Sequence, residues 1–171
     1  MPYYIASDHA GFELKNRLRL TLKPRFEFTD LGVFVAEPVD YPDIAIKLAK
    51  KVATEKGALG VLVCGTGIGM SIAANKVPGV RAAVLYDGFS AKMAREHNDA
   101  NIACVGARAM SEMMTIEMIK LFLTTPFSGH TKEGERHLLR VKKIEQIEKE
   151  QFKRWQGKPE KKGSNNAGAS E

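Results

Sequence analysis

The feature that most constrains the fold is the alternation of short apolar runs with longer amphipathic segments along this 171-residue chain. Residues 59–64 form a continuous apolar run of strand length, which is typical of a parallel strand covered on both faces. The segments between such runs carry apolar residues at the spacing of one helix face. Strands that alternate with helices predict a doubly wound α/β domain with a mostly parallel sheet.

We expect a single domain over residues 1–156, with five strands and helices on both faces of the sheet. The predicted strands are 3–7, 26–31, 59–64, 81–86 and 102–106, and the predicted helices are 11–23, 43–57 (capped by Asp43 and ended by Gly57), 68–76, 88–98, 110–124 and 133–155. The last helix follows the completed sheet, so it could cover its own core or pack on a second subunit. Residues 157–171 contain no Val, Leu, Ile, Met or aromatic residue, and we expect a disordered tail.

Composition and charge exclude several classes of protein. No run of 18 apolar residues predicts a transmembrane helix, and the first residues lack the features of a signal peptide. Two cysteines are too few for a disulfide scaffold, so we expect a cytoplasmic protein. Most of the net charge of +6 lies after residue 131, where the signs alternate along a helical pattern. That pattern favours a solvated helix face over a nucleic-acid partner.

The first candidate site follows the first predicted strand, in Ser7-Asp-His-Ala-Gly11. Ligands of open parallel sheets bind where the carboxyl ends of the strands meet. A carboxylate beside an imidazole can bind hydroxyls, move protons or hold a phosphate. The alternative is structural, since Asp8 would also suit a helix cap and His9 a surface loop.

The second candidate site is Cys64-Gly-Thr-Gly-Ile-Gly69, which joins a strand to a helix. Glycines at alternate positions let backbone amides point into a concavity at a helix N-terminus, which is an anion site. The spacing matches neither the dinucleotide fingerprint nor the P-loop. Amide dipoles favour a thiolate, so Cys64 would be a base beside an oxyanion hole. The alternative is a buried strand-end cysteine beside a packing turn. Cys104 lies inside an apolar run, and we expect it to be part of the core.

Two further pairs of residues suit a polar, phosphorylated ligand. His97 and Asn98 precede the last predicted strand, and we expect both to reach a substrate at the same edge of the sheet. Arg136 and Arg140 lie four residues apart, on one face of the last helix. Two neighbouring guanidinium groups suit a phosphate dianion, although solvated helix arginines would show the same spacing.

Six motifs in order identify a resemblance to a known family. They are Asp8-His-Ala-Gly11, Val39-Asp-Tyr-Pro-Asp43, Cys64-Gly-Thr-Gly-Ile-Gly-Met-Ser-Ile-Ala-Ala-Asn-Lys76, Gly79-Val-Arg-Ala82, His97-Asn-Asp-Ala-Asn101 and Gly134-Glu-Arg-His137. The chain resembles, over about residues 3–150, the type B ribose-5-phosphate isomerases, a family that includes galactose-6-phosphate isomerase subunits and allose-6-phosphate isomerases. The resemblance implies interconversion of ribose 5-phosphate and ribulose 5-phosphate through a cis-enediolate, without a metal or an organic cofactor.

The same resemblance implies a role for each site residue. Cys64 would move the proton between C1 and C2, and His97 would help to open the furanose ring. The other implied contacts are Thr66 with the carbonyl and hydroxyl oxygens, the amides of Gly65, Gly67, Ile68 and Gly69 with the enediolate, Asp8, Tyr41 and Asn98 with sugar hydroxyls, and His9, Arg136 and Arg140 with the phosphate, with Arg108 close by. Relatives that lack the cysteine use a glutamate slightly further on, whereas residues 73–75 here offer no carboxylate.

The resemblance further implies a homodimer or a tetramer, with each active site formed between two subunits and the last helix crossing to the neighbour. Two other functions stay open. The first is isomerisation of a six-carbon sugar phosphate, allose 6-phosphate or galactose 6-phosphate, and the second is a non-catalytic sugar-phosphate sensor. Residues 127–134 form a longer segment before the arginine helix than the family pattern has.

Overall fold

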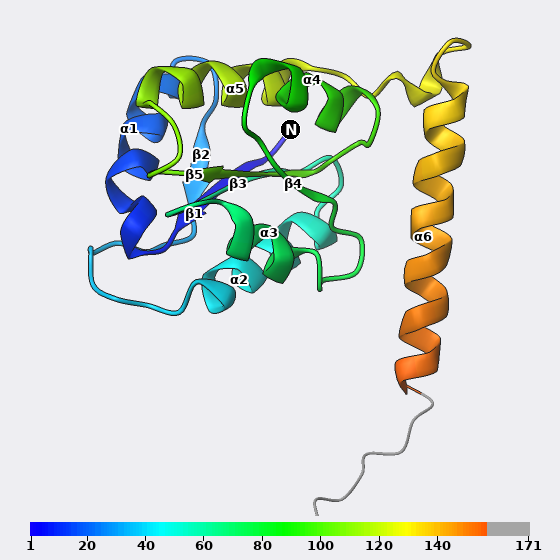
Figure 1. Ribbon diagram of the computed structural model, residues 1–171, viewed down its shortest axis with the longest axis horizontal. Helices are drawn as coiled ribbons and strands as arrows, with labels where there is room; N and C mark the ends of the chain where they lie inside the picture. Colours follow the sequence, from blue (N-terminus) through cyan, green and yellow to red (C-terminus); the bar gives the residue numbers. More distant parts are fainter. Residues whose placement is uncertain (157–171) are drawn as a thin grey trace, which may run out of the picture.

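A single five-stranded sheet forms the centre of the computed structural model, which describes residues 1–156 (Figure 1). Its strands are β1 (Tyr3–Ser7), β2 (Phe28–Asp30), β3 (Leu59–Cys64), β4 (Ala82–Val84) and β5 (Ile102–Gly106). The spatial order is β2-β1-β3-β5-β4, and every neighbouring pair is parallel. The predicted α/β fold is therefore confirmed, with a sheet that is entirely parallel rather than mostly so. The predicted tail, 157–171, lies outside the described residues.

Helices cover both faces of this sheet. The covering helices are α1 (Phe12–Leu22), α2 (Tyr41–Thr54), α3 (Ile68–Ala74), α4 (Gly88–Glu96) and α5 (Glu112–Thr124). A further helix, α6 (Glu135–Gln156), and the short 3-10 turns η1 (His9–Gly11) and η2 (Ser128–His130) complete the elements of the described residues. One core packs α1, α4 and α5 on the first face, and a second packs α2 and α3 on the other. No helix within residues 1–156 is long and apolar enough to span a membrane.

The central strand β3 explains why the layers lie so close together. All six of its residues are buried, as the apolar run predicts. At Gly60, a Cβ atom would lie 2.6 Å from Leu48 Cδ2 of α2, so a side chain there would push the helix away. The edge strands β2 and β4 are shorter than predicted, and each pairs with a neighbour on one side only.

The start and the end of α2 differ from the prediction. The helix begins at Tyr41 after the N-cap Asp40, and Pro42 lies in its first turn, where the fixed φ of proline suits a helix. Asp43 therefore lies inside the first turn instead of capping it, and its charge favours the N-terminal end of the helix dipole. The helix ends at Thr54, and Gly57 lies in the following turn at a φ of 75°.

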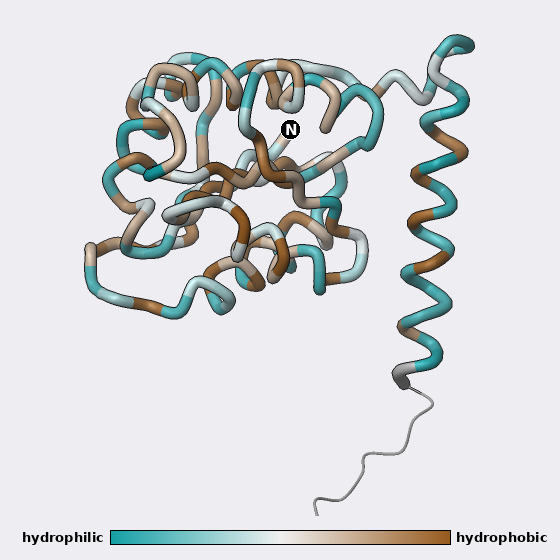
Figure 2. The backbone as a smooth tube through the Cα atoms, viewed as in Figure 1, coloured by the Kyte–Doolittle hydropathy of each residue, from teal (hydrophilic) through white to brown (hydrophobic). Residues whose placement is uncertain are grey.

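The last helix, α6, stands to one side of the α/β body and is not part of its layers (Figure 1). Figure 2 shows hydrophobic positions repeating along this mostly hydrophilic helix. Four of the large apolar side chains on α6 are exposed: Leu139, Ile144, Ile147 and Phe152. Polar contacts tie the helix to the body, because the Gly79 amide donates to Glu148 at 2.9 Å. These four side chains therefore do not cover the core of their own chain, whereas Val141 of the same helix is buried.

Candidate active site

The glycine loop between β3 and α3 holds the thiol of Cys64 against a backbone amide. Cys64 is 5% exposed, and the Gly67 N–H donates to its sulfur over 3.1 Å. Gly67 has a φ of 82°, and a Cβ there would lie 3.1 Å from the backbone of Val105, so both conformation and space require glycine. An N–H aimed at a sulfur is a contact that a thiolate accepts more strongly than a thiol.

The loop amides are not all directed outward. The Ile68 N–H donates to Thr66 Oγ1 at 3.3 Å, and the Gly67 N–H is directed at the thiol. Two of the four amides predicted to stabilise an oxyanion therefore have partners inside the loop. The amides of Gly65 and Gly69 complete the predicted set at the start of α3.

Arg108 and Tyr41 flank the glycine loop. The Arg108 N–H donates to the Gly65 carbonyl at 3.0 Å, and its guanidinium lies 3.7 Å from where a Cβ at Gly65 would be. At Gly69 a Cβ would meet the Tyr41 ring at 2.6 Å, so glycine allows the tyrosine to lie against the start of α3. A cation and a phenol therefore stand beside the glycine loop.

Asp8 and His9 lie at the same edge of the sheet. The Asp8 amide donates to the Val63 carbonyl at 3.2 Å, which places this loop beside the end of β3. The buried Asp8 carboxylate accepts the Gly11 amide at 3.0 Å and caps the 3-10 turn η1, so the structural role considered for it is present. The exposed His9 ring accepts the Val39 amide at Nδ1 over 3.4 Å.

His97 and Asn98 lie at the opposite edge of the sheet, contrary to our expectation. Asn101, three residues further on, accepts the Gly60 amide at 2.8 Å beside the start of β3. Six strand residues separate that edge from Cys64, about 17 Å at the usual rise. The physical reason is direction, because His97 precedes a parallel strand whereas Cys64 ends one. Within one chain, His97 does not meet Cys64.

The start of α6, which carries Arg136 and Arg140, lies against His97 and not against Cys64. The ring of His137, in the first turn of α6, stacks on the ring of His97. The ring centroids are 3.9 Å apart and the planes are 7° from parallel. Ser128 donates to the carbonyl of Glu96 at 2.6 Å and holds the segment before α6 against the end of α4. Arg136 and Arg140 therefore begin a helix that starts beside His97.

His137 is a site residue that the sequence reasoning missed. It is 4% exposed, and its pKa is lowered, first by burial and then by the positive potential of His97, Arg136 and Arg140. The Gly134-Glu-Arg-His137 motif contained it, but stacking between residues forty apart in the chain has no signal in a single sequence.

The site residues thus form two groups. The carboxyl-edge cluster comprises Asp8, His9, Tyr41, Cys64, Gly65, Thr66, Gly67, Ile68, Gly69 and Arg108. The amino-edge cluster comprises His97, Asn98, Arg136, His137 and Arg140. Within residues 1–156, no group of three or more His, Cys, Asp or Glu residues is placed to hold a metal ion.

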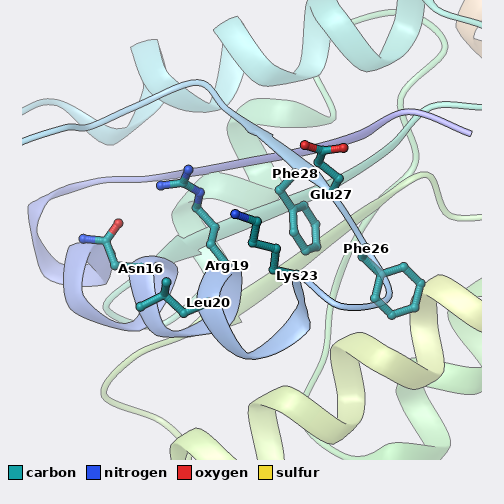
Figure 3. Close-up of a pocket in the computed structure, with 7 residues that line it drawn as sticks. All are labelled: Asn16, Arg19, Leu20, Lys23, Phe26, Glu27 and Phe28. Carbon is teal, nitrogen blue, oxygen red and sulfur yellow. The ribbon is translucent and has the colours of Figure 1, made fainter.

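A separate surface pocket of about 340 Å³ lies outside both clusters (Figure 3). Its lining comes from the outer side of α1 and from the chain leading into β2, and consists of Asn16, Arg19, Leu20, Lys23, Phe26, Glu27 and Phe28. None of these residues belongs to the motifs quoted above. This pocket is therefore not where the chemistry is expected.

Comparison with known proteins identifies the family of the chain. The family model described as Ribose/Galactose Isomerase matches residues 3–144. A ribose-5-P isomerase B of Listeria innocua is 41% identical over 140 residues, which cover 81% of this chain and 95% of that protein.

Solved structures agree in fold and in sequence. A type B ribose 5-phosphate isomerase from Trypanosoma cruzi is similar with a TM-score of 0.82 and 48% identity, covering 88% of this chain and 99% of that one. Ribose-5-phosphate isomerase B from Mycoplasma genitalium, solved with bound ribulose-5-phosphate, is similar with a TM-score of 0.81 and 39% identity, covering 87% and 97%. The chain therefore belongs to the ribose/galactose isomerase family and is an aldose–ketose isomerase of sugar phosphates.

Proposed function

We propose that this enzyme interconverts ribose 5-phosphate and ribulose 5-phosphate through a cis-enediolate, with Cys64 as the base and His97 assisting ring opening. The observation that carries the proposal is the thiol of Cys64, which sits at the head of a glycine loop with an amide aimed at its sulfur at 3.1 Å. The relatives named above support the five-carbon substrate.

The carboxyl-edge cluster has the parts that proton transfer beside a carbonyl needs. The Cys64 thiolate would take the proton from C2 of the open-chain aldose, and the electron pair would move to the C1 oxygen to give the enediolate. A proton would then pass from the C2 hydroxyl to the C1 oxygen, and return of the proton from Cys64 to C1 would form the C2 carbonyl of the ketose. We assign the oxyanion contacts to the amides of Gly65 and Gly69, with Thr66 beside the oxygens, because the other two loop amides bond within the loop.

A homodimer would complete the site. The thiol and the His97 group lie at opposite edges of the sheet in one chain, so a second copy must bring its amino-edge cluster to the first copy's glycine loop. The exposed Ile144 and Ile147, three residues apart, give α6 an apolar face for that contact. The isologous interface of a twofold dimer would build two such sites at once. A tetramer would be two of these dimers.

Substrate contacts divide between the two copies in this arrangement. Asp8 and Tyr41 of one copy and Asn98 of the other would hold sugar hydroxyls. The phosphate would meet His9 and Arg108 of one copy and the arginine pair of the other, since guanidinium groups bind phosphate through charge-assisted hydrogen bonds. These contacts would give a role to Arg136 and Arg140, which lie on a helix outside the layers of the body.

A cytoplasmic location is part of the proposal. Both cysteines are free, and a catalytic thiol needs a reducing compartment to stay reduced.

The test is an isomerase assay of the purified protein on ribose 5-phosphate, allose 6-phosphate and galactose 6-phosphate. We expect turnover to favour ribose 5-phosphate and to disappear in Cys64→Ala, while the matched Cys104→Ala control keeps it. A preference for either hexose phosphate would retain the mechanism and replace the substrate. Binding of sugar phosphate without turnover would contradict the proposal in favour of a sensor.

A further inference from the structure

Asp99 has an unusual backbone conformation beside the amino-edge cluster. Its φ is 46°, which makes it the only residue other than glycine with a positive φ among residues 1–156. Aspartate tolerates this left-handed region better than most side chains, yet at an energetic cost. The turn closes α4, because the Asp99 amide donates to the Arg95 carbonyl at 3.1 Å and the Ala100 amide to Ala94 at 2.8 Å. His97, the C-cap of α4, lies inside this turn.

The Asp99 carboxylate is held by two arginines. Arg95 donates to Oδ1 and Arg81 to Oδ2, each at 2.8 Å, and Arg81 Nε also donates to the Asp99 carbonyl at 3.0 Å. The three side chains are only 32%, 11% and 18% exposed for Asp99, Arg95 and Arg81, so water screens these contacts less than at the open surface.

The two arginines connect the turn to separate parts of the fold. Arg95 also donates to the Ala100 carbonyl at 2.7 Å, and its guanidinium lies over the Phe122 ring of α5. Arg81, just before β4, lies 3.8 Å from Glu145 of α6. One carboxylate thus links α4, the start of β4 and, through Arg81, the helix that carries the arginine pair.

We propose that Asp99 is the positioning residue for His97. The pairing of its two carboxylate oxygens with Arg95 and Arg81 would fix the direction of the imidazole toward the partner copy's glycine loop. This inference rests on the proposed function. Asp99 does not touch the substrate in this arrangement and acts through the turn that it closes. A displacement of a reacting group by about 1 Å can cost on the order of 100-fold in rate.

Three substitutions separate the carboxylate from the backbone conformation. Asp99→Ala removes both the ion pairs and the tolerance of positive φ, whereas Asp99→Gly restores the tolerance alone. Asp99→Asn keeps an acceptor oxygen and tolerates the left-handed region. We expect the rate of conversion of ribose 5-phosphate to fall on the order of 10- to 100-fold in the Ala and Gly variants. The rate of the Asn variant should lie between those of the wild type and the Ala variant. The control is Glu117→Gln, an exposed acid on α5 paired with Lys120.

A second measurement distinguishes positioning from a general loss of structure. Ribulose 5-phosphate has no furanose form because its C5 hydroxyl is esterified, so exchange of its C1 hydrogen with deuterium oxide requires the Cys64 half of the site but not ring opening. In the Asp99 variants we expect this exchange to persist, and the oligomer to persist in sedimentation, while conversion of ribose 5-phosphate falls.

Each other outcome counts against the proposal. Parallel loss of exchange and conversion would make Asp99 merely structural, and wild-type conversion in Asp99→Gly would remove any role of the carboxylate. If the Ala variant fails to fold, the Asn variant decides, since an unchanged rate there and in Gly contradicts the proposal. A wild-type protein inactive on ribose 5-phosphate would instead refute the proposed function.

Discussion

The two clusters of site residues are built by different means. The carboxyl-edge cluster is made largely of backbone, with three glycines that let amides, a thiol and the Tyr41 ring approach one another. The amino-edge cluster is made of side chains, with a ring stack between two of them and an ion-paired turn at Asp99 beside them. The glycine loop at the centre of the first is one continuous stretch, residues 64–69, whereas the ring stack of the second joins residues forty apart. An anion-stabilising loop is therefore set locally, whereas the group proposed to open the ring depends on tertiary contacts and on a second copy.

The largest expected effect falls on the carboxyl edge. Cys64→Ala should lower kcat on the order of 1000-fold or more, because the base that moves the proton is lost while substrate binding is kept.

Alkylation by iodoacetamide should likewise inactivate the wild type, with protection by substrate. Cys104 should not react, since it is fully buried and burial raises its pKa. Equal labelling of both thiols would contradict a special role for Cys64.

Mixing two inactive variants tests whether the clusters meet across copies. Cys64→Ala and His97→Asn each disable both sites of a homodimer, but a mixed dimer places both defects in one site and leaves the other intact. Random exchange of subunits should therefore restore about a quarter of the wild-type activity. No recovery after exchange shown by native mass spectrometry would mean that each site belongs to a single chain.

Removing one arginine of the amino-edge cluster should have a smaller effect, confined to binding. Arg136→Ala should raise KM for ribose 5-phosphate by roughly 10- to 100-fold with little change in kcat, because a charge-assisted hydrogen bond contributes about 1.5–3 kcal/mol. Lys143→Ala, which removes an exposed cation from the same helix, is the matched control. An unchanged KM accompanied by loss of the dimer would make the arginine structural.

The smallest effect concerns pH and the stack of His97 on His137. The pKa of His137 is lowered from its ordinary value of 6.5 in the folded protein, so the unfolded chain takes up the proton more readily. The contribution of the neutral His137 to the free energy of unfolding is thus fully present above about pH 6.5 and is lost as the pH falls below it. His137→Phe keeps a flat ring without the titration, so its free energy of unfolding should fall less between pH 7.5 and 5.5, measured by urea denaturation. Parallel curves for the two proteins would contradict this assignment.

Much of the fold was predictable because its signals are local. The buried run at β3 and the helical stripes indicated the parallel α/β sheet, and the alternate glycines indicated the amide-lined loop. The start of α2 was wrong by three residues, since Asp40 and Asp43 carry the same capping signal and the fixed φ of Pro42 decides between them. The position of His97 was wrong because we grouped a segment that precedes a strand with segments that follow one.

The placement of the two clusters at opposite edges of the sheet also bears on inheritance. In a dimer with shared sites, a chain defective only at Cys64 leaves its wild-type partner one working site. A chain defective at both Cys64 and His97 leaves no working site. Its Cys64 defect inactivates one of the two shared sites, and its His97 defect inactivates the other. Two lesions carried on the same chain would therefore remove more activity from a mixture with wild-type chains than either lesion alone.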